Sequence, residues 1–345
     1  MSSSTKHSPP AAPANRKRRG LWKPAVKVIL TLIVLAAAGR HVSNTWDQLR
    51  EGGRAVAFEP WRLAGAAVVY AAGLGACAIF FARVLAASGR PIPLIGAVRA
   101  YFISHLGKYV PGKALVVVMR AGLAAPWGAG MLSSVTATFY ETFVMMAAGG
   151  LIATIGFTFG ASDVFPVEFA GYSFEAPLWL LGLGATIVFL VVVDPRLFPL
   201  VGRRLASTVK SASMDEFPRI DFRLLFEGLA LMSIAWLLLG LSQVLVLSSM
   251  GVDLSVGTIP RVIASVALAT VAGFAVPISP GGLGVREWVL WTALGSSIDR
   301  DLAVVAALAL RLVWFAAELA AAAALAPVRP QGGPPISIDP RPSDI

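Results

Sequence analysis

Long runs of apolar residues, separated by short charged connections, dominate the sequence. Residues 63–82 hold no charged side chain between Arg62 and Arg83, and residues 131–159 hold only Glu141. Because a helix needs about 20 mostly apolar residues to cross the hydrocarbon core of a bilayer, runs of this length predict transmembrane helices. The runs lack the alternation of apolar and polar residues that a membrane β-barrel requires. The pattern therefore predicts an all-α polytopic membrane protein.

The composition agrees with this pattern and excludes a water-soluble globular protein. Hydrophobic residues make up 57% of the chain and charged residues 14%, and the mean hydropathy is +0.74. The segments expected within or across the membrane are residues 22–42, 63–82, 99–123, 131–159, 177–193, 228–252, 261–295 and 302–327. They define a membrane domain over residues 21–327. We expect disordered flanks, namely a basic cytoplasmic tail at residues 1–20 and a Pro-rich tail at residues 328–345.

The distribution of charge predicts the orientation of the chain. The formal net charge of +10 does not indicate nucleic-acid binding, because seven basic residues precede the first apolar run with no acidic residue among them. By the positive-inside rule, such a segment stays in the cytoplasm. Residues 194–223 carry six basic residues and are expected inside, whereas residues 160–176 carry three acidic and no basic residues and are expected outside. We therefore expect a multi-pass protein of the plasma or inner membrane with both termini cytoplasmic.

Counting the crossings predicts two segments that enter and leave the membrane on the same side. Two spans return the chain to the cytoplasm, and the span at residues 131–159 must also leave from there. Residues 99–123 are therefore expected to form a re-entrant helical hairpin, and the same count makes residues 261–295 re-entrant from outside. The halves, about residues 21–160 and 177–327, then form an inverted repeat of transmembrane helices. The alternative is that one or both hairpins are ordinary spans, which gives seven or eight crossings.

Both segments contain strings of residues that interrupt a helix. Residues 107–113 read Gly-Lys-Tyr-Val-Pro-Gly-Lys, and residues 277–287 read Pro-Ile-Ser-Pro-Gly-Gly-Leu-Gly-Val-Arg-Glu. Proline removes a backbone donor and glycine permits positive φ, so the backbone there needs protein or water around it. A helix that begins after Pro-Gly also points free N–H groups at the break, which suits a phosphate. The candidate substrate-binding residues are Lys108, Pro111, Gly112, Lys113, Arg120, Pro280, Gly281, Gly282, Gly284 and Arg286.

Charged residues inside or beside the apolar runs form a second group of candidates. Glu141, Glu287, Arg311 and Glu318 are expected to form ion pairs that lock or couple conformational states, because unpaired charges in a bilayer are costly. Arg311 and Glu318 lie seven residues apart, on one face of a helix. The alternatives are that the basic residues anchor the protein at the cytoplasmic interface and that the buried charges are purely structural. We interpret His105 as a packed or interfacial histidine.

The inverted repeat also makes a geometric prediction. Pro111-Gly112 and Pro280-Gly281 lie 169 positions apart, yet they should approach each other across a pseudo-two-fold axis in the membrane plane and line one cavity. Glu141 and Glu318 should then lie beside basic residues. The expected partners are Lys113, Arg120, Arg286 and Arg311.

The two strings resemble the paired signatures of a flippase-like family, which is named for the transmembrane region of lysylphosphatidylglycerol synthase. The resemblance spans roughly residues 22–327 and is most specific in Pro-Gly-Gly-Leu-Gly-Val-Arg-Glu at residues 280–287. Pro-Gly-Lys at residues 111–113 and Arg120 match more loosely. Glu141 matches an acidic position of the family, although Thr142 stands where an arginine is expected beside it.

The resemblance implies a flippase of the cell envelope that binds and translocates an anionic lipid, such as an aminoacylated phospholipid or a polyprenyl-phosphate-linked sugar. The alternative is a membrane subunit or enzyme in lipid-linked glycosyl or aminoacyl transfer, with a glycosyltransferase or another lipid-modifying enzyme as partner. The larger synthases append a soluble aminoacyl-transfer domain, so we expect no lipid aminoacylation by this chain alone. The sequence holds no Walker loop, zinc-protease motif or metal-ligand cluster, and we expect no catalytic residue, metal or cofactor.

Overall fold

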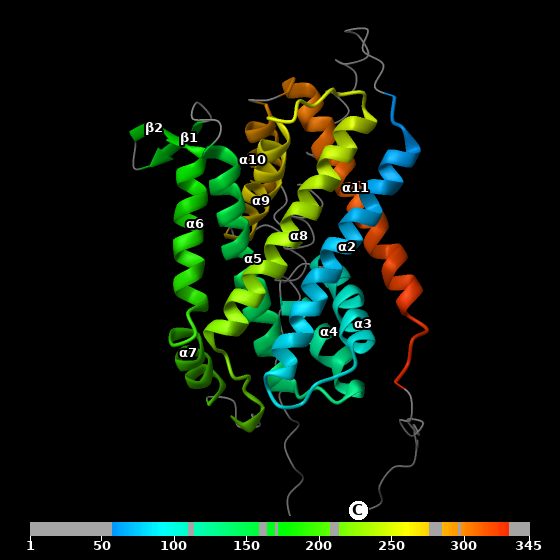
Figure 1. Cartoon of the computed structure of the whole chain (residues 1–345), viewed down its shortest axis with the longest axis vertical. Helices are drawn as coiled ribbons and strands as arrows, with labels where there is room; N and C mark the ends of the chain where they lie inside the picture. The colour runs from blue at the N-terminus through cyan, green and yellow to red at the C-terminus, as the bar shows by residue number, and fades with distance from the viewer. Residues whose placement is uncertain are drawn as a thin grey trace, which may run out of the picture.

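The computed structural model describes residues 57–109, 114–158, 164–169, 172–207, 214–275, 285–295 and 298–330. Over these ranges the chain forms a bundle whose longest helices run side by side along the long axis of the molecule (Figure 1). The expected first span at residues 22–42 lies outside the described residues. The expected N-terminal tail and nearly all of the expected C-terminal tail also lie outside them.

Four helices within the described part are long and apolar enough to cross a membrane. Each has 26 to 28 residues, and they are α2 (Pro60–Ala86), α5 (Met131–Thr158), α8 (Phe222–Ser249) and α11 (Arg300–Leu325). Their positions match four of the predicted spans, which confirms an all-α polytopic membrane protein. α6 (Leu178–Val193) has 16 residues and adds a fifth crossing if it is counted together with α7 (Leu197–Ala206), from which it is bent by 58°.

Two elements at the ends of the bundle lie outside the sequence-based predictions. β1 (Val164–Phe169) and β2 (Tyr172–Pro177) pair as an antiparallel hairpin at one end, called here the hairpin end (Figure 1). α7 lies at the opposite end, called the α7 end, where Arg203 and Arg204 are exposed. The 3-10 helix η3 (Met214–Glu216) follows α7 in the chain. A search for apolar runs of membrane length overlooks such elements because they are too short.

Two pairs of short helices lie at opposite ends of the bundle (Figure 1). At the α7 end, α3 (Leu94–His105) and the 3-10 helix η1 (Leu106–Tyr109) pack against α4 (Ala114–Ala124), which the 3-10 helix η2 (Ala125–Trp127) follows. At the hairpin end, α9 (Ile259–Ala275) packs against α10 (Val285–Leu294). α3, α4 and α10 have 10 to 12 residues, too few to cross a bilayer alone. The residues that join each pair, 110–113 and 276–284, lie outside the described ranges, so the re-entrant hairpins and the inverted repeat remain predictions.

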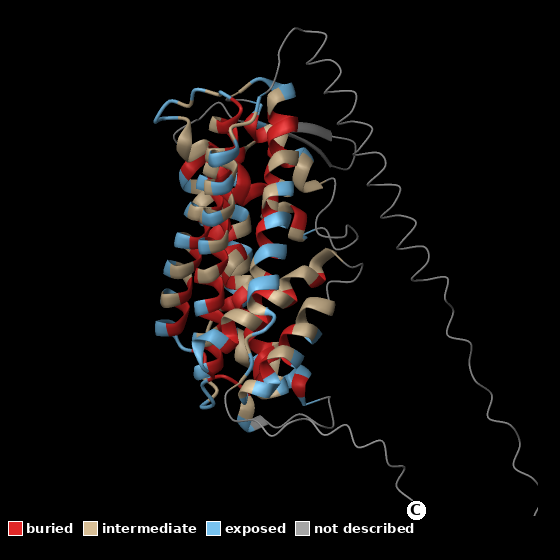
Figure 2. Ribbon diagram, turned by 90° about the vertical axis from the view of Figure 1, so that its right-hand side faces the viewer, coloured by how far each residue is buried: buried red, intermediate tan, exposed pale blue. Residues whose placement is uncertain are grey.

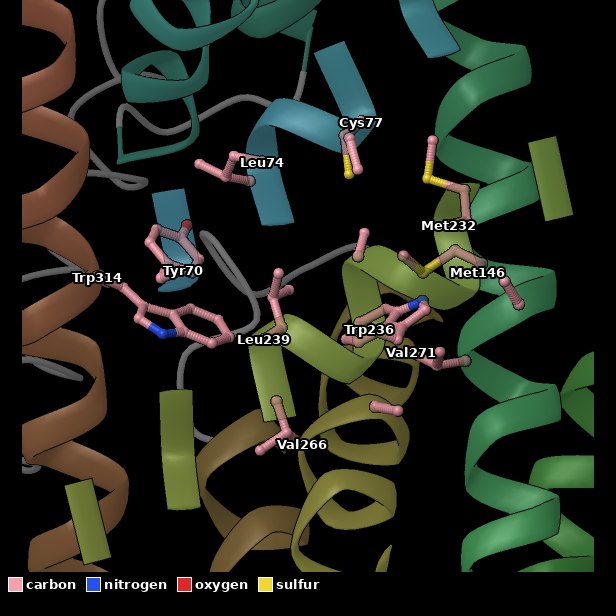
Figure 3. Close-up of a cluster of buried hydrophobic side chains, with 14 of the residues drawn as sticks. Tyr70, Leu74, Cys77, Met146, Met232, Trp236, Leu239, Val266, Val271 and Trp314 are labelled. Atoms are coloured by element: carbon pink, nitrogen blue, oxygen red, sulfur yellow. The ribbon is translucent and has the colours of Figure 1, made fainter. Parts of the chain in front are cut away.

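The hydrophobic core forms where the helices face one another, and Figure 2 shows the buried residues gathered on their inner faces. Trp236 of α8 is fully buried, and its Nε1 donates to the backbone oxygen of Met145 in α5 at 2.8 Å. Cys77 of α2 is fully buried in the same cluster (Figure 3). Large apolar side chains such as Ile187 and Leu312 are exposed on the outside of the bundle. An apolar exterior suits contact with lipid chains.

Glycine and threonine allow α5 and α6 to approach closely. A Cβ on Gly182 would lie 2.7 Å from the backbone nitrogen of Thr154 and 3.0 Å from the backbone oxygen of Gly150. The hydroxyls of Thr154 and Thr186 each donate at 2.8 Å to the carbonyl oxygen four residues earlier, on Gly150 and Gly182. Small residues spaced by four are typical of close helix pairs in membranes. The two backbones are therefore in direct contact here.

Asp221 caps the N-terminus of α8, and its loss should weaken that helix. Its side chain accepts a hydrogen bond from the backbone nitrogen of Leu224 at 2.8 Å. We expect Asp221→Ala to lower the unfolding free energy by about 1 kcal/mol, because a free N–H group loses its acceptor. Thermal unfolding of the purified protein in detergent measures the change. Asp221→Asn keeps an acceptor oxygen and should cost less; equal losses for the two variants would contradict the capping role.

Candidate functional site

Three ion pairs join different helices in the interior of the described structure. They are Lys108–Glu318, Arg120–Glu141 and Arg311–Glu287. Other ion pairs in the described part, such as Arg83–Glu227, lie at more exposed positions. The interior pairs involve both pairs of short helices and two of the long helices, so they mark the region where these elements meet.

Glu318 of α11 is fully buried and lies at the centre of the first pair. Its Oε1 accepts a hydrogen bond from Lys108 Nζ at 2.6 Å and another from the hydroxyl of Tyr70 in α2. His105 Nε2, at the end of α3, lies 3.7 Å from the same oxygen. Lys108 belongs to η1, which ends directly before residues 110–113. Residues of α2, α3 and η1 therefore contact one carboxylate on α11.

Arg286 contacts α11 one turn away from Glu318. It is the second residue of α10, the helix that begins directly after residues 276–284, and its Cζ lies 4.5 Å from the ring centroid of Trp314. Tyr70 stacks on Trp314 with ring centroids 4.3 Å apart (Figure 3), and Trp314 Nε1 donates to the hydroxyl of Ser242 at 3.1 Å. The indole ring is therefore held in place as a platform for the guanidinium group. Lys108 precedes residues 110–113 and Arg286 follows residues 276–284, and the two contact adjacent turns of α11.

Arg120 of α4 and Glu141 of α5 form the second pair, and both are buried. Arg120 Nη1 donates to Glu141 Oε2 at 3.1 Å, and Tyr101 of α3 donates its hydroxyl to Oε1 at 3.0 Å. Arg120 Nε donates to the hydroxyl of Ser104 at 3.0 Å, and its Cζ lies 3.9 Å from the ring centroid of Tyr101. Thr142 stands where the family resemblance implies an arginine. Arg120 from another helix supplies the opposing charge.

Arg311 and Glu287 form the third pair, between α11 and α10. Arg311 Nη1 donates directly to Glu287 Oε1, and both side chains are partly buried. A small pocket between these helices is lined by Arg286, Glu287, Leu290, Ala307, Leu310 and Arg311. Arg286 therefore borders both this pocket and the Trp314 platform.

Among the described residues of this region, four basic side chains stand against three carboxylates. Lys108, Arg120 and Arg311 each pair with a carboxylate, whereas Arg286 makes no ion pair with any residue that the structure describes. Lys108 also lies within electrostatic range of Arg286 and Arg311. Arg286 is only partly buried, and a charge inside a membrane bundle is costly unless it is paired or ligated. A guanidinium group without an ion-pair partner in the described ranges suits an anionic ligand.

The structure brings together the described members of the predicted sets but assigns some to other partners. Glu141 pairs with Arg120, as expected, whereas Glu318 pairs with Lys108, which was not among its expected partners. Arg311 pairs with Glu287. The predicted positions of Pro111, Gly112, Lys113, Pro280, Gly281, Gly282 and Gly284 lie outside the described residues and remain predictions.

Several uncharged residues of the site were missed by sequence reasoning. Tyr70, Tyr101 and Ser104 orient the charged groups, and Trp314 supports Arg286. His105, interpreted from sequence as a packed or interfacial histidine, stacks on Tyr101 at a centroid distance of 5.8 Å and also faces Glu318. The available signal was chemical: a hydroxyl or an indole N–H within an apolar run needs a buried partner.

Comparison with known protein families places the chain in one of them. No curated protein matches this sequence. The family described as the lysylphosphatidylglycerol synthase TM region matches residues 25–322, which include every charged residue of the site described above. The match covers most of the chain and confirms the family that the paired strings predicted. The chain therefore belongs to the family of the lysylphosphatidylglycerol synthase transmembrane region.

Proposed function

We propose that this membrane protein binds the phosphate of an anionic lipid headgroup and translocates it across the bilayer. The observation that carries the proposal is the convergence of Lys108 and Arg286 on adjacent turns of α11. Each residue flanks one of the two helix breaks. Interrupted segments at matching positions in two halves of a chain are typical of substrate sites in secondary transporters.

The placement of the short helices supports an inverted repeat. α3 and α4 lie at the α7 end and α9 and α10 at the hairpin end, as two re-entrant hairpins entering from opposite sides require (Figure 1). We place the α7 end in the cytoplasm because its exposed residues include Arg83, Arg90, Arg203 and Arg204. α11 ends at the α7 end, so the C-terminus is cytoplasmic, and a first span at residues 22–42 would place the N-terminus there as well. The membrane that we propose is the plasma or inner membrane.

The chemistry of the site suits a phosphate. A guanidinium group binds phosphate through two parallel hydrogen bonds, and Arg286 has no carboxylate partner in the described ranges that would compete. Lys108 adds a second cation, whose ammonium group can leave the Glu318 carboxylate and bind the phosphate instead. The headgroup can be a phospholipid or a polyprenyl-phosphate-linked sugar, since both carry the group that the site recognises.

Headgroup translocation in proteoliposomes tests the proposal. The probe is a phosphatidylglycerol with a fluorophore on its acyl chain, and its movement between leaflets is followed by chemical quenching from outside. We expect Arg286→Gln to slow translocation at least about tenfold, because charged hydrogen bonds worth about 1.5–3 kcal/mol are lost. Arg329→Gln removes an exposed charge beyond the end of α11, with no ion pair among the described residues, and serves as the matched control.

Equal rates for wild type and Arg286→Gln would remove Arg286 from the site. Wild-type protein that binds the labelled lipid without moving it would instead favour the alternative role, a membrane subunit that presents a lipid to a glycosyltransferase or another lipid-modifying enzyme. Binding is measured separately, by retention of the labelled lipid on purified protein in detergent.

A further inference from the structure

The two carboxylate oxygens of Glu318 differ in their hydrogen bonding. Oε1 accepts hydrogen bonds from Lys108 and Tyr70, whereas Oε2 is buried and has no hydrogen-bond partner among the described residues. Titratable and charged side chains from several helices surround the Glu318 carboxylate. They are Tyr70 of α2, His105 of α3, and Lys108 and Tyr109 of η1. Arg286 of α10 contacts Trp314 one turn earlier on α11, and Arg311 of α11 pairs with Glu287.

If the proposed function holds, Lys108 binds the Glu318 carboxylate in the empty site and the lipid phosphate in the loaded site. In the structure its ammonium group neutralises Glu318, which is fully buried. A phosphate that binds at Arg286 and Lys108 displaces the carboxylate from this lysine. Glu318 then keeps its negative charge in the interior without a cation in contact, beside a bound anion. The bound phosphate would then add a negative charge to the interior without a matching cation, and uptake of a proton by the carboxylate would restore the balance.

We propose that Glu318 is a proton-binding residue that couples movement of the anionic headgroup to movement of a proton. A proton from water forms an O–H bond at Oε2 when the headgroup phosphate takes over Lys108, and it returns to water when the phosphate leaves. Lys108, Arg286 and Glu318 carry one net positive charge before binding. With one phosphodiester and one proton added they carry the same net charge, so the site keeps its charge balance while loaded. The inference rests on the proposed function.

The geometry distinguishes Glu318 from the other interior carboxylates. Both oxygens of Glu141 accept hydrogen bonds, from Tyr101 and Arg120. Glu287 pairs with Arg311, which is held on the neighbouring helix. Only Glu318, among these three, shares its cation with the proposed phosphate site and leaves one oxygen without a partner in the described part of the chain. Tyr70 donates to Oε1 and can do so whether or not Oε2 carries a proton.

Proton uptake upon lipid binding is the direct test. Short-chain phosphatidylglycerol is added to the purified wild-type protein in weakly buffered detergent with a pH indicator, and bound lipid is measured in parallel. We expect about one proton to be taken up per lipid bound. Glu318→Gln, which mimics the protonated acid, should bind the lipid without proton uptake, whereas Glu227→Gln at the exposed Arg83 pair should behave as wild type.

A second measurement uses sealed proteoliposomes with a proton gradient. Wild-type translocation of the labelled lipid should accelerate when the side of lipid entry is more acidic, and Glu318→Gln should lose this response. If Glu318→Gln fails to fold, Glu318→Asp, which keeps a proton-binding group, should retain it. Wild-type protein that translocates lipid with no proton uptake and no response to the gradient would overturn the inference and leave the proposed function standing. Wild-type protein that neither binds nor translocates the lipid would overturn the proposed function.

Discussion

Glu141→Ala is expected to lower the unfolding free energy by about 3–5 kcal/mol, the cost of leaving one partner of a buried ion pair without its counter-charge. Arg120 is almost fully buried, and Glu141 is its only ion-pair partner among the described residues. The substitution also removes the acceptor of the Tyr101 hydroxyl. Since Tyr101, Arg120 and Glu141 come from α3, α4 and α5, the loss should loosen the packing of the first pair of short helices against α5.

A double substitution shows whether the loss of stability comes from the unpaired charge of Arg120 or from any change at these two positions. Arg120→Met with Glu141→Leu replaces both charges by apolar groups, and we expect it to recover much of the stability lost by Glu141→Ala. Thermal unfolding in detergent is the measurement for both variants. Glu227→Ala at the exposed Arg83 pair is the control and should change stability far less. Wild-type stability for Glu141→Ala would show that Arg120 does not depend on this carboxylate.

Gly182→Val should destabilise the protein by about 3 kcal/mol or more, the upper range for overpacking. The new Cβ would lie 2.7 Å from the backbone nitrogen of Thr154 and 3.0 Å from the backbone oxygen of Gly150. Backbone atoms of a helix cannot rotate away as a side chain can. The clash is relieved only if α6 moves as a whole away from α5, which breaks the closest contact between these helices.

Gly184 provides a matched control on the same helix. A Cβ at Gly184 has no neighbouring atom within 4 Å, so Gly184→Val changes only helix propensity and the outer surface. We expect its unfolding temperature in detergent to stay close to that of the wild type, and that of Gly182→Val to fall well below it. Similar losses at both positions would indicate that valine disfavours α6 itself rather than its approach to α5.

The membrane helices could be predicted from sequence because length and apolarity alone decide whether a segment can span a bilayer. The charged site residues could be predicted for a related reason: a charge inside an apolar run is costly, so Glu141 and Glu318 stand out in the sequence. Partners could not be assigned in the same way. Lys108 reaches Glu318 across 210 positions because of how η1 and α11 pack, and no local pattern records that contact.

Polar but uncharged residues were harder to recognise for a different reason. Tyr70 and Trp314 have side chains that are mostly apolar, and each is common in a membrane core. Their role depends on a single polar atom or ring face that meets a charged neighbour from another helix. The β-hairpin and α7 were missed because they lie at the ends of the bundle, where the length of the hydrocarbon core no longer constrains the chain.

The position of Cys77 makes the wild-type sequence a ready background for site-directed thiol labelling. It is the sole cysteine of the chain, and its side chain is fully buried in the core cluster (Figure 3). Water-soluble maleimides react with accessible thiolates and should leave Cys77 untouched while the protein is folded. A cysteine introduced at Ser207, exposed at the α7 end, or at Val256, exposed at the hairpin end, is then the only reactive group. Its modification from one side of a sealed vesicle reports directly which end of the bundle faces the cytoplasm.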